Sequence, residues 1–212
     1  MKAIAAAMVS LTLAGCSAFG IRSGTEEPSY KLLAMSEGVE IREYGPRVVI
    51  ETLVEGDADS VRNEGFRRLA GYIFGDNRSQ AKIAMTAPVA QSSAQSSQTI
   101  AMTAPVAQDR DASGFWRIRF FAPSAMTLET MPAPNDARVT IAQTPGRTYA
   151  VRRFTGDRSS EAVAPQEKLL RESLSSQPWA PDGDALAWFY DPPWTLPFLR
   201  RNEVAIPVKR RD

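Results

Sequence analysis

The chain has 212 residues, no histidine and one cysteine, and its 25 Lys and Arg residues nearly balance its 24 Asp and Glu residues. Without histidine it cannot build a Ser-His-Asp triad, a Cys-His pair or a zinc site with histidine ligands. A single cysteine excludes a disulfide within the chain, and a formal charge of +1 gives no electrostatic reason to expect a nucleic-acid partner.

The N-terminus is typical of a secreted protein. Lys2 precedes an apolar run over residues 3–13, which is too short to span a bilayer because a spanning helix needs about 20 residues. The run ends in Leu13-Ala14-Gly15-Cys16. This ending resembles the lipobox of bacterial lipoproteins, in which the chain is cut before a cysteine that carries the lipid. The alternative is an ordinary signal peptide with a chance cysteine.

We therefore predict a signal peptide over 1–16, a flexible tether over 17–29 and one domain over 30–212. Cys16 is the predicted lipidation site, and several acyl chains would attach the protein stably to a membrane. By resemblance to lipoprotein sorting rules, Ser17 favours the outer membrane of the cell envelope, facing the periplasm.

The first half of the domain predicts a strand hairpin, a helix and two further strands. Residues 39–44 alternate in polarity and residues 47–54 are β-branched, which indicates two strands around Gly45-Pro46. Asp57 is a candidate N-cap for a helix that Gly75 ends. The predicted buried face of this helix comprises Val61, Phe66, Leu69, Ala70 and Ile73. Residues 83–89 predict a short strand, and 115–120 predict a strand with Trp116, Ile118 and Phe120 on one side.

The second half repeats this order. Residues 146–154 predict a strand that ends in Thr155-Gly156-Asp157, and a helix follows to about Ser175 with Leu169, Leu170 and Leu174 facing inward. Pro165 is expected in the first turn of that helix or at its true start, because proline has no backbone N–H. Residues 185–190 and 203–208 predict the last two strands.

A nine-residue block, Ile-Ala-Met-Thr-Ala-Pro-Val-Ala-Gln, occurs at 83–91 and again at 100–108. The segment between the copies is rich in Ser and Gln, which is typical of a flexible linker. We favour a lengthened hairpin in which both copies are edge strands, since Pro88 and Pro105 cannot donate a ladder hydrogen bond. The alternatives are that one copy is looped out, or that Met85 and Met102 face one ligand.

Two further blocks carry a family resemblance. Met85-Thr86-Ala87-Pro88-Val89 comes after the first predicted helix, and Tyr190-Asp191-Pro192-Pro193 precedes Arg200-Arg201-Asn202-Glu203-Val204. In this order and spacing they resemble the signature blocks of the SOUL haem-binding family over residues 30–210. The resemblance implies an α+β fold: a duplicated β-α-β-β unit whose antiparallel sheet curls into a distorted barrel, with two helices packed outside.

The resemblance implies a haem or related tetrapyrrole ligand, held against the first helix and nearby loops. The cofactor-binding candidates are Arg62, Asn63, Phe66, Leu69, Ala70, Ile73, Met85, Trp194, Phe198 and Arg200. For Arg200 and Arg201 we favour a structural pair with Glu203 over contact with a ligand. With no histidine, any axial iron ligand would come from Met85, Met102 or Tyr72, each of which is also explained by packing. We expect weak ligation or none.

Two other classes of function stay open. The first is a structural or partner-binding envelope lipoprotein without a small ligand. The second is a small-molecule hydrolase, because the duplicated fold resembles the effector-binding domains of bacterial regulators and their hydrolase relatives. Such chemistry would pair a Glu with a Tyr, either Glu203 with Tyr190 or Glu43 with Tyr44. We predict a binding protein and no catalytic residues.

Overall fold

The computed structural model describes residues 25–79, 82–83, 85–93, 115–192 and 194–211. The strands are β1 (Lys31–Ser36), β2 (Val39–Tyr44), β3 (Arg47–Glu55), β4 (Val89–Ser93), β5 (Phe115–Phe121), β6 (Val139–Thr144), β7 (Arg147–Phe154), β8 (Trp179–Pro181), β9 (Leu186–Phe189) and β10 (Asn202–Arg210). The helices are α2 (Ala58–Ile73), α3 (Ser160–Leu174) and the short 3-10 helix η2 (Pro197–Leu199). The predicted α+β class is confirmed.

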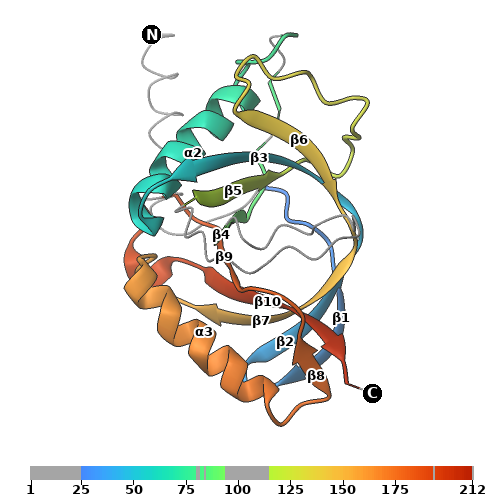
Figure 1. Ribbon diagram of the computed structural model, residues 1–212, viewed down its shortest axis with the longest axis vertical. Helices are drawn as coiled ribbons and strands as arrows, with labels where there is room; N and C mark the ends of the chain where they lie inside the picture. The colour runs from blue at the N-terminus through green and yellow to red at the C-terminus, as the bar shows by residue number, and fades with distance from the viewer. Residues whose placement is uncertain (1–24, 80–81, 84, 94–114, 193, 212) are drawn as a thin grey trace, which may run out of the picture.

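All strands join one antiparallel sheet in the order β1-β2-β7-β10-β9-β4-β5-β3-β6, with β8 attached to β10. The order supports the predicted duplication. Apart from β1, each strand of the first half has a counterpart in the second: β2 corresponds to β6, β3 to β7, β4 to β9 and β5 to β10. If every strand on the path from β2 to β6 is replaced by its counterpart, the same neighbours result, in reverse order. In Figure 1, α2 lies beside β3 and β5, α3 lies beside β7 and β10, and β4 and β9 lie between the two halves.

The sheet is curled, as expected, and it is not closed. Its path ends at β1 on one side and at β6 on the other, and these two strands do not pair. The side chains of β1 are exposed along its whole length, as expected for an edge strand. Among the described residues, no helix is long and apolar enough to cross a membrane.

Helix α2 begins as the sequence predicts. The carboxylate of Asp57 accepts hydrogen bonds from the backbone N–H groups of Asp59 and Ser60, which caps the helix. Leu69 and Ile73 pack against the sheet with almost no exposure. Gly65 permits the close approach, because a Cβ atom at this position would overlap the side chain of Ile118 on β5.

Helix α3 differs from the prediction in two ways. It begins at Ser160, after the N-cap Ser159, so Pro165 lies within it rather than in its first turn. Only the hydrogen bond to the carbonyl of Glu161 is lost, near the start of the helix. Leu169 is 41% exposed, whereas Leu170 and Leu174 are fully buried. Leu170 and Leu174 are four residues apart and share a face, and Leu169 is rotated from Leu170 by about 100°.

The repeated block gives a second correction. Its first copy supplies β4, which begins at Val89, so the predicted strand over 83–89 was placed too early. β4 is not an edge strand, since it pairs with both β5 and β9. Pro88 precedes the strand, after a cis peptide bond with Ala87, and therefore breaks no ladder hydrogen bond. The second copy, residues 100–108, lies outside the described residues.

Apolar residues form three clusters on the two faces of the sheet. α2 covers one cluster and α3 covers another. The third contains Val49 and Val151, whose chain neighbours Ile50 and Ala150 belong to the helix-covered clusters. Because successive strand residues point to opposite faces, the third cluster lies on the face turned away from the helices. Trp188 and Tyr44 are packed there edge to face, 5.6 Å apart between ring centroids.

Candidate functional site

A cavity of about 420 Å³ lies where α2, the segment before β4 and the turn after β9 meet. This volume is within the range of small-molecule sites, roughly 300–1,000 Å³. We call it the α2 cavity, and its lining residues are Thr25, Arg62, Asn63, Phe66, Phe74, Met85, Thr86, Ala87, Val89, Arg158, Phe189, Tyr190, Asp191, Pro192 and Trp194.

Six of its fifteen lining residues are aromatic or contain sulfur. Phe66 is half-buried and packs edge to face on Phe120, with 5.4 Å between ring centroids. Phe189 is buried at the end of β9, whereas Phe74, at the C-terminus of α2, is 62% exposed. Trp194 is 64% exposed. A planar apolar molecule in the cavity could therefore cover rings that the protein itself leaves partly exposed.

Two guanidinium groups flank the ring of Phe189. The Cζ atom of Arg62 lies 4.8 Å from the ring centroid and that of Arg158 lies 6.0 Å from it. Arg62 donates hydrogen bonds to Asp59 at 2.8 Å and to Gln91 at 3.1 Å. Arg158 donates to the backbone carbonyl of Asp191 at 3.2 Å, and within the described part of the chain it forms no ion pair.

The electrostatics around Arg158 favour an anion. Burial, followed by the positive charges of Arg200 and Arg62, lowers the pKa of Arg158 to about 10, against which Asp157 and Asp191 act in the opposite direction. A carboxylate placed in the cavity would offset both the desolvation and the repulsion between cations. The wall and its charge together suit a flat apolar molecule that carries a carboxylate.

The cavity gathers half of the residues predicted as ligand contacts. Arg62, Asn63, Phe66, Met85 and Trp194 line it. Three others from the same helix, Leu69, Ala70 and Ile73, are buried and do not line it; Leu69 and Ile73 belong to the core cluster against the sheet. One face of α2 therefore packs on the core and another lines the cavity. The sequence analysis did not distinguish these two faces.

The remaining two candidates lie near the cavity without lining it. Phe198 is on η2 and is 69% exposed. Arg200 donates a hydrogen bond from Nε to the carbonyl of Thr195 at 2.7 Å, and its charge acts on Arg158 through space. Sequence reasoning missed Arg158, Phe189 and Phe74. Arg158 is 95 positions from Asn63 in the chain, and no local pattern joins them.

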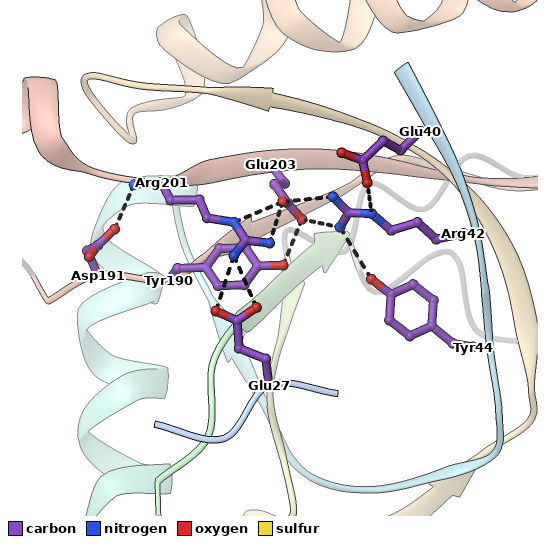
Figure 2. A network of polar contacts seen from close by, with 8 residues as sticks. All are labelled: Glu27, Glu40, Arg42, Tyr44, Tyr190, Asp191, Arg201 and Glu203. Atoms are coloured by element: carbon purple, nitrogen blue, oxygen red, sulfur yellow. Dashed lines mark hydrogen bonds and ion pairs between the residues drawn. The ribbon is translucent and has the colours of Figure 1, made fainter. Parts of the chain in front are cut away.

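Glu203 is the centre of a second, closed cluster of charges (Figure 2). It is fully buried on β10 and accepts hydrogen bonds from Arg42 at 2.8 and 3.2 Å and from Arg201 at 2.8 and 3.0 Å. The hydroxyl of Tyr190 donates to it at 2.7 Å. The structural reading of the Arg201–Glu203 pair is thereby confirmed.

The pKa values in this cluster are set by burial and by the charges that its members place on one another. Burial alone would raise the pKa of Glu203, but the hydrogen bonds and charges of Arg42 and Arg201 lower it below its ordinary value. Burial, together with the negative charge of Glu203, raises the pKa of Tyr190 well above its usual range. The predicted Glu203–Tyr190 pair does meet: Tyr190 lines the α2 cavity, whereas the carboxylate of Glu203 is fully buried.

The other chemical candidates are not assembled into a site. Glu43 is exposed and Tyr44 is buried, because adjacent residues of β2 face opposite sides. Tyr72 is buried and donates to the carbonyl of Pro132 at 2.7 Å, and burial raises its pKa to about 12. Cys16 and Met102 lie outside the described residues. Within those residues, no cluster of three or more His, Cys, Asp or Glu side chains could hold a metal ion.

The sequence profile of the SOUL heme-binding protein family matches residues 25–207. Mouse heme-binding protein 2 is 29% identical over 167 residues, which cover 72% of this chain and 76% of that protein. Its human counterpart is 34% identical over 132 residues, which cover 62% of this chain and 58% of that protein.

Two solved structures share the fold at low identity. The C-terminal domain of EcmrR matches with a TM-score of 0.57 and 11% identity, covering 85% of this chain and 98% of that one. A hydrolase from Listeria innocua matches with a TM-score of 0.58 and 13% identity, covering 84% of this chain and 94% of that one. Both likenesses concern the arrangement of the backbone.

Proposed function

Because the chain belongs to the SOUL heme-binding protein family, we propose that it binds haem or a related tetrapyrrole in the α2 cavity. The observation that carries this proposal is the pairing of an aromatic wall with Arg158, a half-buried cation that forms no ion pair with a described residue. A tetrapyrrole offers a flat apolar ring, which can stack on the aromatic side chains of the wall, and carboxylate groups, which can pair with Arg158.

Each side of the cavity has a separate role in this proposal. Phe66, Phe189 and Trp194 contact the ring, and Arg158 pairs with a carboxylate. A bound haem supplies an iron that accepts axial ligands, and Met85 places a thioether in the cavity wall. The sequence contains no histidine, so we expect ring burial and charge pairing to supply most of the affinity. The proposed role is carriage, buffering or sensing, without catalysis.

A haemin titration followed by Soret absorbance tests the proposal. We expect saturation near one equivalent, and Trp194→Ala should weaken binding by about tenfold because a large aromatic contact is lost. Met35→Ala is the matched control, since Met35 is 67% exposed on the edge strand β1 and does not line the cavity. A titration that does not saturate, or equal affinities for the two variants, would contradict the proposal.

We also propose that the protein is a lipoprotein of the cell envelope, attached through Cys16. The support is the Leu13-Ala14-Gly15-Cys16 ending of the apolar N-terminal run. Mass spectrometry of the protein purified from membranes should show an acylated cysteine at the new N-terminus, and Cys16→Ser should move the protein to the soluble fraction. An uncleaved chain, or a Cys16→Ser variant that stays in the membrane fraction, would overturn this assignment.

A further inference from the structure

The described residues expose twelve large apolar side chains, and four of them lie at the C-terminus of α2 and in the loop after β9, beside the α2 cavity. Trp194 and Phe74, both lining residues, are 64% and 62% exposed. Phe198 and Leu196, which follow Trp194 in the same loop, are 69% and 41% exposed. We call these four residues the mouth patch. Large exposed side chains are scattered singly on most proteins, whereas a group at a cavity mouth marks an interaction surface.

The loop that carries three of the four patch residues is held in place by hydrogen bonds. The backbone N–H of Gly156 donates to the carbonyl of Pro197 at 2.9 Å, and Arg200 bonds the carbonyl of Thr195 at 2.7 Å. Thr195 itself is fully buried. The exposed rings are therefore presented by a fixed backbone and not by a loose loop, which reduces the conformational entropy lost on docking.

Charge and chain path indicate which partner the patch fits. Arg158 and Arg200 lie at the base of this loop, so the patch combines aromatic and aliphatic side chains with cations. That combination is typical of surfaces that dock on anionic lipid, with Trp and Phe at the headgroup boundary. Thr25 lines the same cavity, nine residues after Cys16. Nine extended residues span at most about 30 Å.

We propose that the mouth patch docks on the bilayer that holds the lipid anchor, so that the α2 cavity opens directly onto the membrane surface. This inference deepens the proposed function and rests on it for the identity of the ligand. An apolar ligand then passes between the lipid and the cavity without crossing water. The anchor keeps the domain near the membrane, and the patch fixes which side of the domain faces it.

Fluorescence of the full chain reconstituted into vesicles tests the proposal. The vesicles contain phosphatidylethanolamine and phosphatidylglycerol with brominated acyl chains, which quench tryptophan on contact. We expect quenching in the wild type that is absent in Trp194→Phe. Phe198→Ala should lower the ratio of docked to undocked protein by about tenfold, because one large apolar contact is lost. Met35→Ala, with a similarly exposed side chain at 67%, should match the wild type.

The outcomes separate this inference from the proposed function. Equal quenching in the wild type and Trp194→Phe, or equal effects of Phe198→Ala and Met35→Ala, overturns membrane docking. Shielding of Trp194 from acrylamide in a dimer without vesicles also overturns it, because a second copy then covers the patch. Haemin titration of the same samples is independent, since Phe198 does not line the cavity. Docking without haemin binding contradicts the ligand, and haemin binding without docking contradicts only this inference.

Discussion

Two arginine clusters in this protein have similar components and opposite character. In the first, Arg42 and Arg201 converge on the buried carboxylate of Glu203 (Figure 2). In the second, Arg62 and Arg158 flank the ring of Phe189 at the α2 cavity, where Arg62 pairs with Asp59 and Arg158 forms no ion pair with a described residue. The first cluster is electrically complete within the chain, whereas the second is completed by a ligand in our proposal.

The comparison shows how one type of residue serves either stability or binding. A buried carboxylate with several charge-assisted hydrogen bonds fixes the positions of its neighbours. Here Glu203 on β10 connects β2, through Arg42, with Tyr190 at the start of the 190–201 loop. Arg201 also pairs with Glu27 in the N-terminal segment, with 3.0 Å between Nη1 and Oε2. The second cluster leaves a desolvated cation beside an open cavity. This arrangement destabilises the empty protein and favours an anionic ligand.

The largest effect is expected when the closed cluster is broken. Glu203→Gln removes the negative charge and leaves the guanidinium of Arg42, which is 2% exposed, without its buried counter-charge. We expect a loss of about 3–5 kcal/mol in the free energy of unfolding, measured by urea denaturation. Glu64→Gln is the control, because Arg67 is 75% exposed and Arg68 keeps its hydrogen bonds to Thr52 and Leu53, so the change should cost about 1 kcal/mol or less.

The same variant should alter the pH dependence of stability. The pKa of Glu203 is lower in the folded state than its ordinary value of 4.5. Its contribution is therefore fully present above pH 4.5 and is lost as the pH falls through the lower, folded-state pKa. The wild type should lose more stability than Glu203→Gln in this acid range. Parallel curves for the two proteins would show that Glu203 is not the group that titrates.

The open cluster should respond in the opposite direction. Arg158 has a folded-state pKa near 10, below its ordinary 12.5, so its charged form destabilises the empty protein at neutral pH and this penalty disappears only at alkaline pH. Because the side chain is half exposed, the effect is reduced by solvent. We expect Arg158→Gln to raise the melting temperature by about 2–4 °C.

Arg158→Gln should at the same time weaken haemin binding by about tenfold, because a charge-assisted pair is lost. Arg67→Gln is the control for both measurements, since the Arg67 side chain is 75% exposed and does not line the cavity. A variant that loses both stability and affinity would show that Arg158 is a structural residue. In that case the contrast between the two clusters would not hold.

The sequence was sufficient wherever the determining contacts are local. The N-cap at Asp57 follows from residues a few positions apart, and so does the Arg201–Glu203 pair, since alternate residues of a strand share a face. It was insufficient for Arg42, which meets Glu203 across 161 positions, and for Arg158. Such long-range partners depend on the sheet order, which no short motif contains.

The errors in the candidate site have the same origin. Leu69 and Ile73 share α2 with Asn63 and Phe66, and helical periodicity alone did not separate the face on the sheet from the face on the cavity. Pro88 suggested an edge strand because proline cannot donate to a ladder, yet it stands just outside β4. In both cases the residue chemistry was interpreted correctly and its place in the fold was not.

The crossed pairing of the sheet has a consequence for how the chain folds. β2, in the first half, pairs with β7, while β6, in the second half, pairs with β3, so neither half completes its own sheet. β10 follows all the other described strands in the chain but lies between β7 and β9, and it carries Glu203. Arg42 therefore cannot meet its buried counter-charge until β10, 161 positions further along the chain, is in place. Such high contact order makes the folding of this domain slow.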